Sequence, residues 1–385
     1  MEKKVIKKSD WVANFTLSGT PKINEDYTFK IDERSEKSNW VYNSMNLGID
    51  CGERHGVIYA EMMGGYGEDR ENKLYKHGKK DDGSDDFEKQ IIVDWEDRLD
   101  EDILEEIGEL SFITIGLETT DKGKTYYKKF LSEYDAIAYV KEHLTEDMVV
   151  NVRGNLKYST YNGVTQVRKT ITSIALSKVD DASKYAAKFT QTVLVDKDSA
   201  SLKNIDKDKG VMYVNTKVLD YVKEINGVEV KGQYPFDKQF EFELNLENEK
   251  LCKTILDKLF KVKKGVTQIT FDGEFIEGGA VTTATWDDIP DDIKGLVEMG
   301  LYDKEEALAK CTVNGNRERR MVLKKPSIKL VGEDKIPVIQ KFEERYEEED
   351  LVLDYLYDFN EVEDEEVPFN EDAESDDSMD WLSKL

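Results

Sequence analysis

Three aromatic residues fall on the same side of two neighbouring strand-like stretches, where they could form a surface for stacking. In "NWVYNSMNLGI", apolar side chains occupy four of the five alternate positions from Val41 to Ile49, which leaves Trp40 and Tyr42 on the opposite side. The same parity in "GVIYAEMM" turns Tyr59 outward. Exposed rings stack on planar groups such as bases, each stacked base contributing roughly 1–3 kcal/mol. Trp40, Tyr42 and Tyr59 are therefore predicted to form a stacking surface.

Cationic residues follow in a later strand and hairpin. In "VVNVRGNLKY" the apolar residues share one face, so Arg153 and Lys157 fall on the other, and the next strand-like run adds Tyr161 and Arg168. Rings beside cations are the combination that single-stranded nucleic acids require, because bases stack while phosphates need positive charge. We expect these four residues to line one groove with the aromatic residues. No catalytic group is needed for such binding, so an enzyme is not expected.

The second half of the chain offers a weaker version of the same pattern. Tyr213, Lys217 and Tyr221 share one parity, whereas a later strand is expected to turn Gln268, Asp272 and Glu274 outward. This half is expected either to bind nucleic acid weakly or to serve as an interaction domain.

A basic run near residue 320 has a less specific meaning. "NGNRERRMVLKK" gathers five cations, and such a run more often forms a solvated surface than a binding site. Pro326 follows directly, which predicts an edge strand because proline cannot donate a ladder hydrogen bond.

The elements that position these residues indicate a small barrel. Strand-like runs fill residues 11–179, interrupted by the helical "YDAIAYVKEHL", and Asn162-Gly163 predicts a tight hairpin after the helix. Several strands, one helix and a final long hairpin are the order of an OB-fold, a five-stranded Greek-key barrel that binds oligonucleotides. A second unit beginning near Lys188 repeats this order of elements.

The segment "YVKEHLTEDMVVNVRGNLKYSTYNGVTQVRKTITSIAL" resembles the helix, fourth strand, hairpin and fifth strand of single-stranded DNA-binding proteins. The tandem arrangement is similar to members of that family with several OB-folds on one chain, including those encoded by phages. The resemblance implies a protein that binds and protects single-stranded DNA during replication, recombination or repair. It also implies that no cofactor takes part.

The fold class expected is mainly β, with short helices. The predicted organisation comprises two tandem OB-folds at 1–180 and 185–284, a small α+β segment at 286–342 and a disordered acidic tail at 343–385. The first OB-fold carries an acidic and polar insert near 67–110, of which about 67–88 is expected to be a mobile loop.

The net charge of −27 would argue against a nucleic-acid ligand if it were spread evenly. Residues 343–380 carry 19 acids against Arg345 alone, and residues 81–109 carry 14 acids against Lys89 and Arg98. The remainder of the chain is near neutral to weakly basic, so a basic groove is permitted.

The acidic tail contains two apolar tips that could bind partner proteins. Its "EEVPF" resembles the acidic tip that ends bacterial single-stranded DNA-binding proteins, which implies a role for Val367, Pro368 and Phe369 in recruiting replication or recombination proteins. Sixteen residues follow Phe369, so Trp381 and Leu382 are an alternative tip. A tethered polyanion can also compete with DNA for the protein's own cations.

Other classes of function remain open at this stage. A DNA mimic or scaffold would use the barrels for protein contacts, and a metal-dependent nuclease could use the carboxylates of "DDGSDD" and "VDWEDRLDED". Cys51, Cys252 and Cys311 are far apart and form no CxxC pair, so no metal site is expected. No apolar run reaches 18 residues and no signal peptide precedes the first strand, which predicts a cytoplasmic protein, in the host cytoplasm if phage-encoded.

Overall fold

The computed structural model describes residues 6–353 except 37, 180, 226, 279–280, 283–285, 287–288, 305–306, 309–312, 315–317 and 333. The chain is mostly β with few short helices, which confirms the predicted fold class. Within the described residues, no helix is both long and apolar enough to cross a membrane.

Five strands of the first half close into a barrel. Neighbouring strands pair in the order β1–β3–β4–β10–β9 and back to β1, and the β4–β10 pair is parallel while the others are antiparallel. This is the strand order of an OB-like barrel. The strands are β1 (Ala13–Lys22), β3 (Trp40–Asp50), β4 (Val57–Gly67), β9 (Val150–Tyr161) and β10 (Val164–Leu176).

Alternating side chains fill this barrel, because successive residues of a strand point to opposite faces. Leu17, Leu47 and Val152 are fully buried inside it. Helix α2 (Glu133–His143) packs against β3 and β4, with its first turn capped by the Ser132 hydroxyl. The predicted hairpin at Asn162-Gly163 is confirmed, and both residues adopt the positive φ that this tight turn requires.

The insert in the first barrel is ordered, so the expected mobile loop at 67–88 is wrong. Two strands form a hairpin, β5 (Lys73–Lys79) and β6 (Asp85–Asp94), followed by α1 (Glu101–Glu106). The polar sequence conceals the hairpin because only one of its faces is covered, by a small cluster around Val93, Ile107 and Phe112. Strands β2 (Phe29–Arg34), β7 (Ile113–Thr119) and β8 (Thr125–Phe130) extend the sheet around the first barrel.

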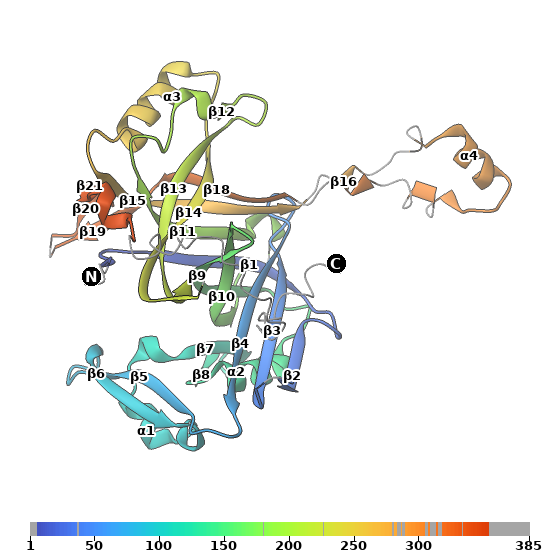
Figure 1. The fold of residues 1–385 in the computed structure, drawn as a ribbon. Helices are drawn as coiled ribbons and strands as arrows, with labels where there is room; N and C mark the ends of the chain where they lie inside the picture. The colour runs from blue at the N-terminus through green and yellow to red at the C-terminus, as the bar shows by residue number, and fades with distance from the viewer. Residues whose placement is uncertain are drawn as a thin grey trace, which may run out of the picture.

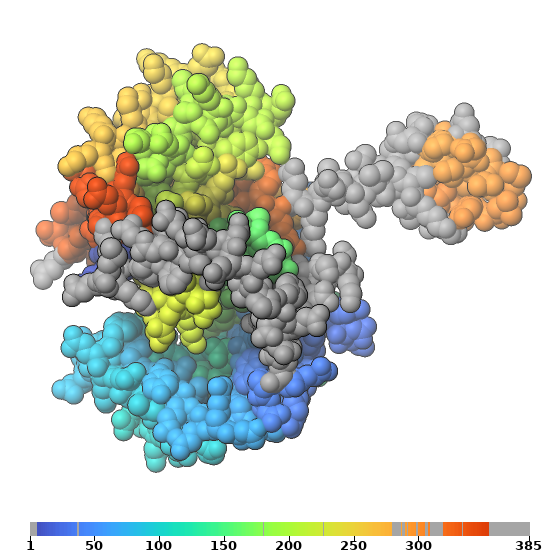
Figure 2. All heavy atoms as spheres, viewed as in Figure 1, coloured from blue at the N-terminus to red at the C-terminus, as the bar shows by residue number. Residues whose placement is uncertain are grey.

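The second half repeats the same topology. The pairings run β11–β13–β14–β18–β15 and back to β11, again with one parallel pair, β14–β18, and with a helix between the third and fourth strands. These elements are β11 (Ala186–Val195), β13 (Val211–Ile225), β14 (Val228–Glu243), α3 (Glu249–Ile255) with a π-helical turn at Leu256–Phe260, β15 (Val266–Gly278) and β18 (Glu318–Pro326). β1 also pairs with β11, so one ladder joins the two barrels. Figures 1 and 2 show most of the second barrel in the upper part of the molecule, β3 and β4 with the insert in the lower part, and the segment around α4 projecting to the right.

Strand β18 corrects two expectations. It lies between β14 and β15 rather than at an edge, and it supplies the fifth strand that a unit ending at residue 284 would lack. Two cations of its basic run are neutralised there, since Arg320 pairs with Glu241 and Lys324 pairs with Glu243. Pro326 is tolerated because it is the last residue of the strand.

The ordered body extends beyond residue 343, where the tail was expected to begin. β21 (Lys341–Tyr346) pairs with β15, and Leu351 and Leu353 are buried with Ile6 and Val266. The tail tips at Val367, Pro368, Phe369, Trp381 and Leu382 lie outside the described residues. The remaining short elements are β12 (Ile205–Asp206), β16 (Val281–Thr282), α4 (Asp291–Glu298), β17 (Val313–Asn314), β19 (Ile328–Val331) and β20 (Ile336–Ile339).

Candidate nucleic-acid interface

The outer face of β3 carries a pair of stacked rings. Trp40 and Tyr42 are half-buried, their centroids lie 4.8 Å apart, and their planes are inclined by 16°. The intervening Val41 points into the protein and is buried. Because the two rings stack on each other, each covers one face of its neighbour, and the pair forms an apolar platform that can stack a base on a remaining outer face.

Tyr59 lies on the same face, but farther along the strands. It sits opposite Gly48, and a Cβ at Gly48 would lie 3.1 Å from the Tyr59 ring, so the glycine leaves room for this ring. Tyr42 sits opposite Gly65, six residues from Tyr59 on β4, which corresponds to about 20 Å along a strand. Met63, 49% exposed, lies between them on this face and was missed by the sequence reasoning, although it shares the parity of Tyr59.

Two of the expected cations lie level with Tyr59. Arg168 on β10 and Lys157 on β9 are cross-strand partners. Because Thr170 aligns with Glu61 in the parallel β4–β10 pair, Arg168 aligns with Tyr59. The structure therefore brings Tyr59, Arg168 and Lys157 into one row across three strands. Tyr161 is exposed four residues beyond Lys157, beside the hairpin turn.

Glu61 is an acid beside this row, two residues from Tyr59 on β4. Its carboxylate oxygen Oε1 lies 3.8 Å from Arg168 Nε. Burial raises the pKa of Glu61, while the charges of Arg168 and Lys169 oppose that rise. When ionised, Glu61 offsets part of the positive charge that Arg168 would offer to a phosphate.

Arg153 does not join the aromatic pair, contrary to the expectation of one shared groove. It lies on β9, opposite Thr16 of β1 and Ser173 of β10. In the closed barrel β9 is separated from β4 by β10 and from β3 by β1. Arg153 is exposed on a different wall from Trp40, because alternation along one strand fixes a side but not a position around the barrel.

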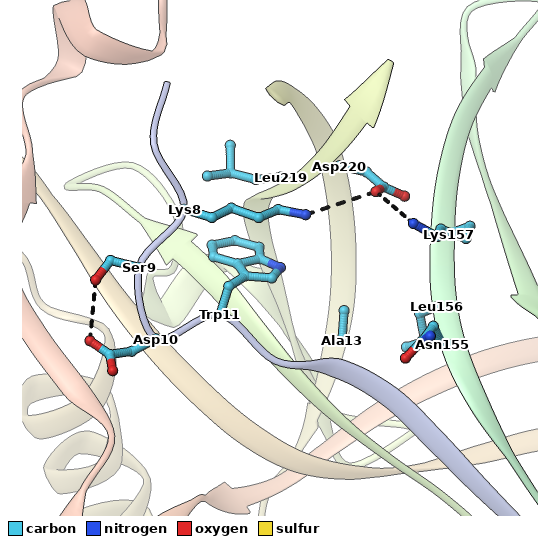
Figure 3. A pocket seen from close by; sticks show the side chains of 10 residues that line it. All are labelled: Lys8, Ser9, Asp10, Trp11, Ala13, Asn155, Leu156, Lys157, Leu219 and Asp220. Atoms are coloured by element: carbon cyan, nitrogen blue, oxygen red, sulfur yellow. Dashed lines mark hydrogen bonds and ion pairs between the residues drawn. The ribbon is translucent and has the colours of Figure 1, made fainter. Parts of the chain in front are cut away.

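Lys157 also borders a pocket of about 380 Å³ between the two barrels, shown in Figure 3. Asp220 of β13 is buried there, with Oδ1 3.5 Å from Lys157 Nζ and 3.8 Å from Lys8 Nζ. Asp220 also accepts hydrogen bonds from the backbone N–H groups of Tyr158 and Tyr221, both 2.8 Å long. The pocket thus contains a buried ionic link that ties the N-terminal segment and β9 to the second barrel.

Lys157 was predicted as a site residue, but its buried partner Asp220 could not be found from the sequence. Asp220 belongs to the other half of the chain and accepts a backbone hydrogen bond at the unpaired edge of β9. No pattern in the local sequence predicts that contact. Burial lowers the pKa of Lys8, the Asp220 charge opposes this effect, and the Lys157 charge adds to it.

The second barrel's corresponding residues do not form one open surface. Lys217 Nζ lies 2.6 Å from Asp237 Oδ1, and the Tyr213 hydroxyl lies 3.4 Å from Asp206. Leu219, between Lys217 and the exposed Tyr221, is buried in the core. The part of β13 between Lys217 and Tyr221 is therefore covered by the rest of the protein, and these two residues do not share one exposed surface.

One of the three residues of β15 that were expected to face outward is buried instead. Gln268 is fully buried, and its Nε2 donates a 2.8 Å hydrogen bond to the carbonyl of Ser9, because the N-terminal segment crosses this strand. Asp272 and Glu274 are partly buried, and Glu274 pairs with Arg54.

Side chains that could hold a metal ion are not gathered in the described part of the chain, where no three His, Cys, Asp or Glu residues are suitably close. Cys252 is buried in α3. Cys51 is buried as well, which raises the pKa of its thiol to about 12.

Comparisons with known proteins give one family and several solved structures, one of which is described below. A family model described as YorF matches residues 70–272. The structure of a deletion mutant of the single-stranded DNA-binding protein from Thermus aquaticus aligns with 8% sequence identity and a TM-score of 0.31, covering 69% of this chain and 87% of that one. None of the curated proteins matches this chain.

Proposed function

We propose that this chain, which belongs to the YorF family, binds single-stranded DNA along the outer face of β3 and β4, largely without sequence preference. The observation that carries the proposal is the stack of Trp40 on Tyr42 on the outside of a closed five-stranded barrel. Barrels of this topology bind oligonucleotides on the same two strands. Stacking does not discriminate between bases, because every base has a π-face.

The arrangement supplies two groups of contacts on one face. The Trp40–Tyr42 platform stacks one base, while Tyr59, Arg168 and Lys157 contact a second base and its phosphates farther along the strand. With roughly 1–3 kcal/mol for each stacked base and additional phosphate contacts, binding reaches micromolar affinity at modest salt. Arg153 contributes from the neighbouring wall of the barrel.

We propose no catalytic step and no cofactor, and we place the protein in the cytoplasm, or in the host cytoplasm if phage-encoded. Bound strands would be protected during DNA replication, recombination or repair. The second barrel contributes less to binding, because Asp237 and Glu241 lie on the face that corresponds to the first barrel's aromatic face. Its Tyr221 is exposed and is the one residue of its predicted set that we expect to contact DNA.

The acidic tail would couple DNA binding to partner proteins. The last residue that the structure describes, Leu353, is buried in a cluster that also includes Trp11 and Leu219, and both of these residues line the pocket beside Lys157. A polyanion tethered there competes with DNA for Lys157 and Arg168. DNA would release the tail, and the tips at Val367–Phe369 or at Trp381-Leu382 would then recruit replication or recombination proteins.

A gel shift and anisotropy series with matched oligonucleotides tests this function. Labelled oligo-dT and oligo-rU of equal length are titrated with the full chain at 50 mM salt and again at 1 M salt. The proposal expects oligo-dT to bind at low salt, with affinity falling steeply as salt rises. Absence of oligo-dT binding at low salt would refute it, and tighter binding of oligo-rU would reassign the ligand to RNA.

An interaction module is the second candidate, favoured by one observation on the insert. A pocket of about 660 Å³ is lined by Tyr75, Phe87 and Leu110, three exposed side chains on an acidic segment. Such a surface suits a basic protein rather than DNA. If this were the whole function, oligo-dT would not bind even after residues 354–385 are removed.

The nuclease alternative stays a prediction with a simple check. The chain is incubated with labelled single strands and Mg²⁺, and intact strands support binding without cleavage. Cleavage that EDTA abolishes would reverse this choice.

A further inference from the structure

The hairpin of β19 and β20 exposes an unusual number of large apolar side chains. The two strands form a sheet of their own, and every residue of both strands is exposed. Ile328 pairs with Ile339 and Leu330 with Pro337, so one face of the hairpin is entirely apolar. The side chains concerned, each 43% to 65% exposed, are Ile328, Leu330, Val331, Ile336, Val338 and Ile339.

The hairpin is firmly attached at its root. Ser327 N–H donates to Thr270 O, Thr270 N–H donates to Gln340 O, and Gln340 N–H donates to Ser327 O, all at 2.8–3.0 Å. These bonds fix both ends of the hairpin to β15. Figure 1 places the hairpin at the margin of the molecule beside β21. A two-stranded hairpin with neither face covered is only marginally stable in water, so a covering surface would stabilise it.

We infer that this hairpin is the contact between two copies of the chain, and that the protein is a homodimer held by β19–β20. Ile328, Leu330 and Ile339 lie on one face, and Val331, Ile336 and Val338 lie on the other. Each face therefore offers roughly 300 Å² of apolar surface, less than the ~800 Å² that each partner buries in a standard interface, so backbone pairing along a strand edge must supply part of the contact. A twofold contact needs a patch complementary to itself, and an apolar hairpin with both faces open meets that requirement.

Charge favours a second copy over a basic protein or a nucleic acid. Residues 328–339 contain two lysines and two acids, so the hairpin is neutral on a chain of net charge −27. It has no ring on which a base could stack and no excess charge to attract a basic protein. Its four-residue strands extend about 13 Å, which exceeds the ~8 Å screening length at physiological salt. Two acidic bodies can therefore meet at their hairpins with little repulsion.

One edge of the hairpin is better suited to strand pairing than the other. Pro337 lies in the middle of β20 and lacks an N–H group, which disfavours that edge as a template for another strand. The edge of β19 has no proline between Ile328 and Val331. The dimer is therefore expected to continue the sheet from β19 to the β19 of the second copy.

Sedimentation equilibrium of the full chain over a range of concentrations tests this inference. The wild-type chain should reach twice the monomer mass at tens of micromolar, whereas Leu330→Lys should remain a monomer at least tenfold beyond that range. Leu202→Lys is the matched control, since Leu202 is similarly exposed at 55% in another part of the surface. It should dimerise like wild type.

Salt separates an apolar contact from an ionic one. Raising NaCl from 50 to 500 mM should not weaken the dimer, because salt screens ionic contacts and leaves apolar contacts in place. A wild-type chain that stays monomeric would overturn the inference, and so would a Leu330→Lys variant that dimerises like wild type. Circular dichroism verifies that both variants are folded, and because position 330 is exposed, its substitution leaves the core unchanged.

Discussion

Trp40 and Tyr42 stack on each other on the outer face of β3, with centroids 4.8 Å apart. Tyr42 lies opposite Gly65 on β4. Because Gly65 has no side chain, β4 places no side chain beside the Tyr42 ring at this position. Burial and the nearby charge of Glu33 raise the pKa of the Tyr42 hydroxyl, so the platform carries no charge at neutral pH. The platform can therefore stack a base, while the neighbouring Glu33 carboxylate is the charge that a phosphate beside Tyr42 would meet.

The phosphate role of Arg168 can be measured through salt dependence. Arg168→Ala should weaken oligo-dT binding and lower the slope of log K against log salt by about 0.7, the value for one phosphate contact on a single strand. Lys261→Ala is the control, because Lys261 is an exposed cation near the end of α3. An unchanged slope in Arg168→Ala would remove Arg168 from the interface.

Glu61 should make binding depend on pH. Its pKa is raised above 4.5 by burial, so its carboxylate gains a proton as pH falls from 7 toward that value. Protonation removes a negative charge beside Arg168, and affinity for oligo-dT should therefore rise toward acid pH. Glu61→Gln should bind more tightly than wild type at pH 7 and show a flatter pH profile. A Glu61→Gln profile as steep as wild type would assign the effect to other acids.

Asp220 should matter for stability rather than for stacking. Asp220→Asn leaves Lys8 partly buried without its anionic partner, and breaking a buried ion pair costs about 3 kcal/mol in the free energy of unfolding. Asp237→Asn is the control, because that carboxylate is exposed and its bridge to Lys217 is worth less than about 1 kcal/mol. Urea denaturation measures both. Equal losses in the two variants would contradict a structural role for the buried link.

Removing the tail should strengthen DNA binding. The truncation must begin at residue 354, because Leu351 and Leu353 belong to the core and their loss would destabilise the body. The shortened chain should bind oligo-dT several-fold more tightly at 50 mM salt, and the difference should vanish at high salt. Replacing the tail's acids with amides at full length should have the same effect. Weaker binding by both variants would contradict competition by the tail.

Which side chains of the first barrel's strands point inward and which point outward could be predicted from sequence, because one face of each strand is buried. Val41 and Met45 are buried while Trp40 and Tyr42 lie outside, and Val152 and Leu156 are buried while Arg153 and Lys157 lie outside. Alternation does not state how strands follow one another around a barrel, so Arg153 was placed with Trp40 although the two lie on different walls.

Contacts between distant segments explain the other differences. Gln268 is polar in sequence but buried, since the carbonyl of Ser9 accepts its hydrogen bond. The fifth strand of the second barrel, β18, comes after a long insertion. Its charged residues make it look exposed in the sequence, although it is a central strand, because their partners, such as Glu241, lie on the adjacent strand β14. Neither the burial of Gln268 nor the central position of this strand can be predicted from the periodicity of the sequence.

The most direct test of the proposed binding face is the affinity of Trp40→Ala/Tyr42→Ala for labelled oligo-dT, measured by fluorescence anisotropy at 50 mM salt. Because the two rings act as one platform, the double variant should lose about one stacked base, a decrease of roughly 5- to 150-fold in affinity. Tyr126→Ala, which removes an exposed tyrosine on β8, should bind like wild type. Wild-type affinity in the double variant would show that the outer face of β3 does not bind DNA.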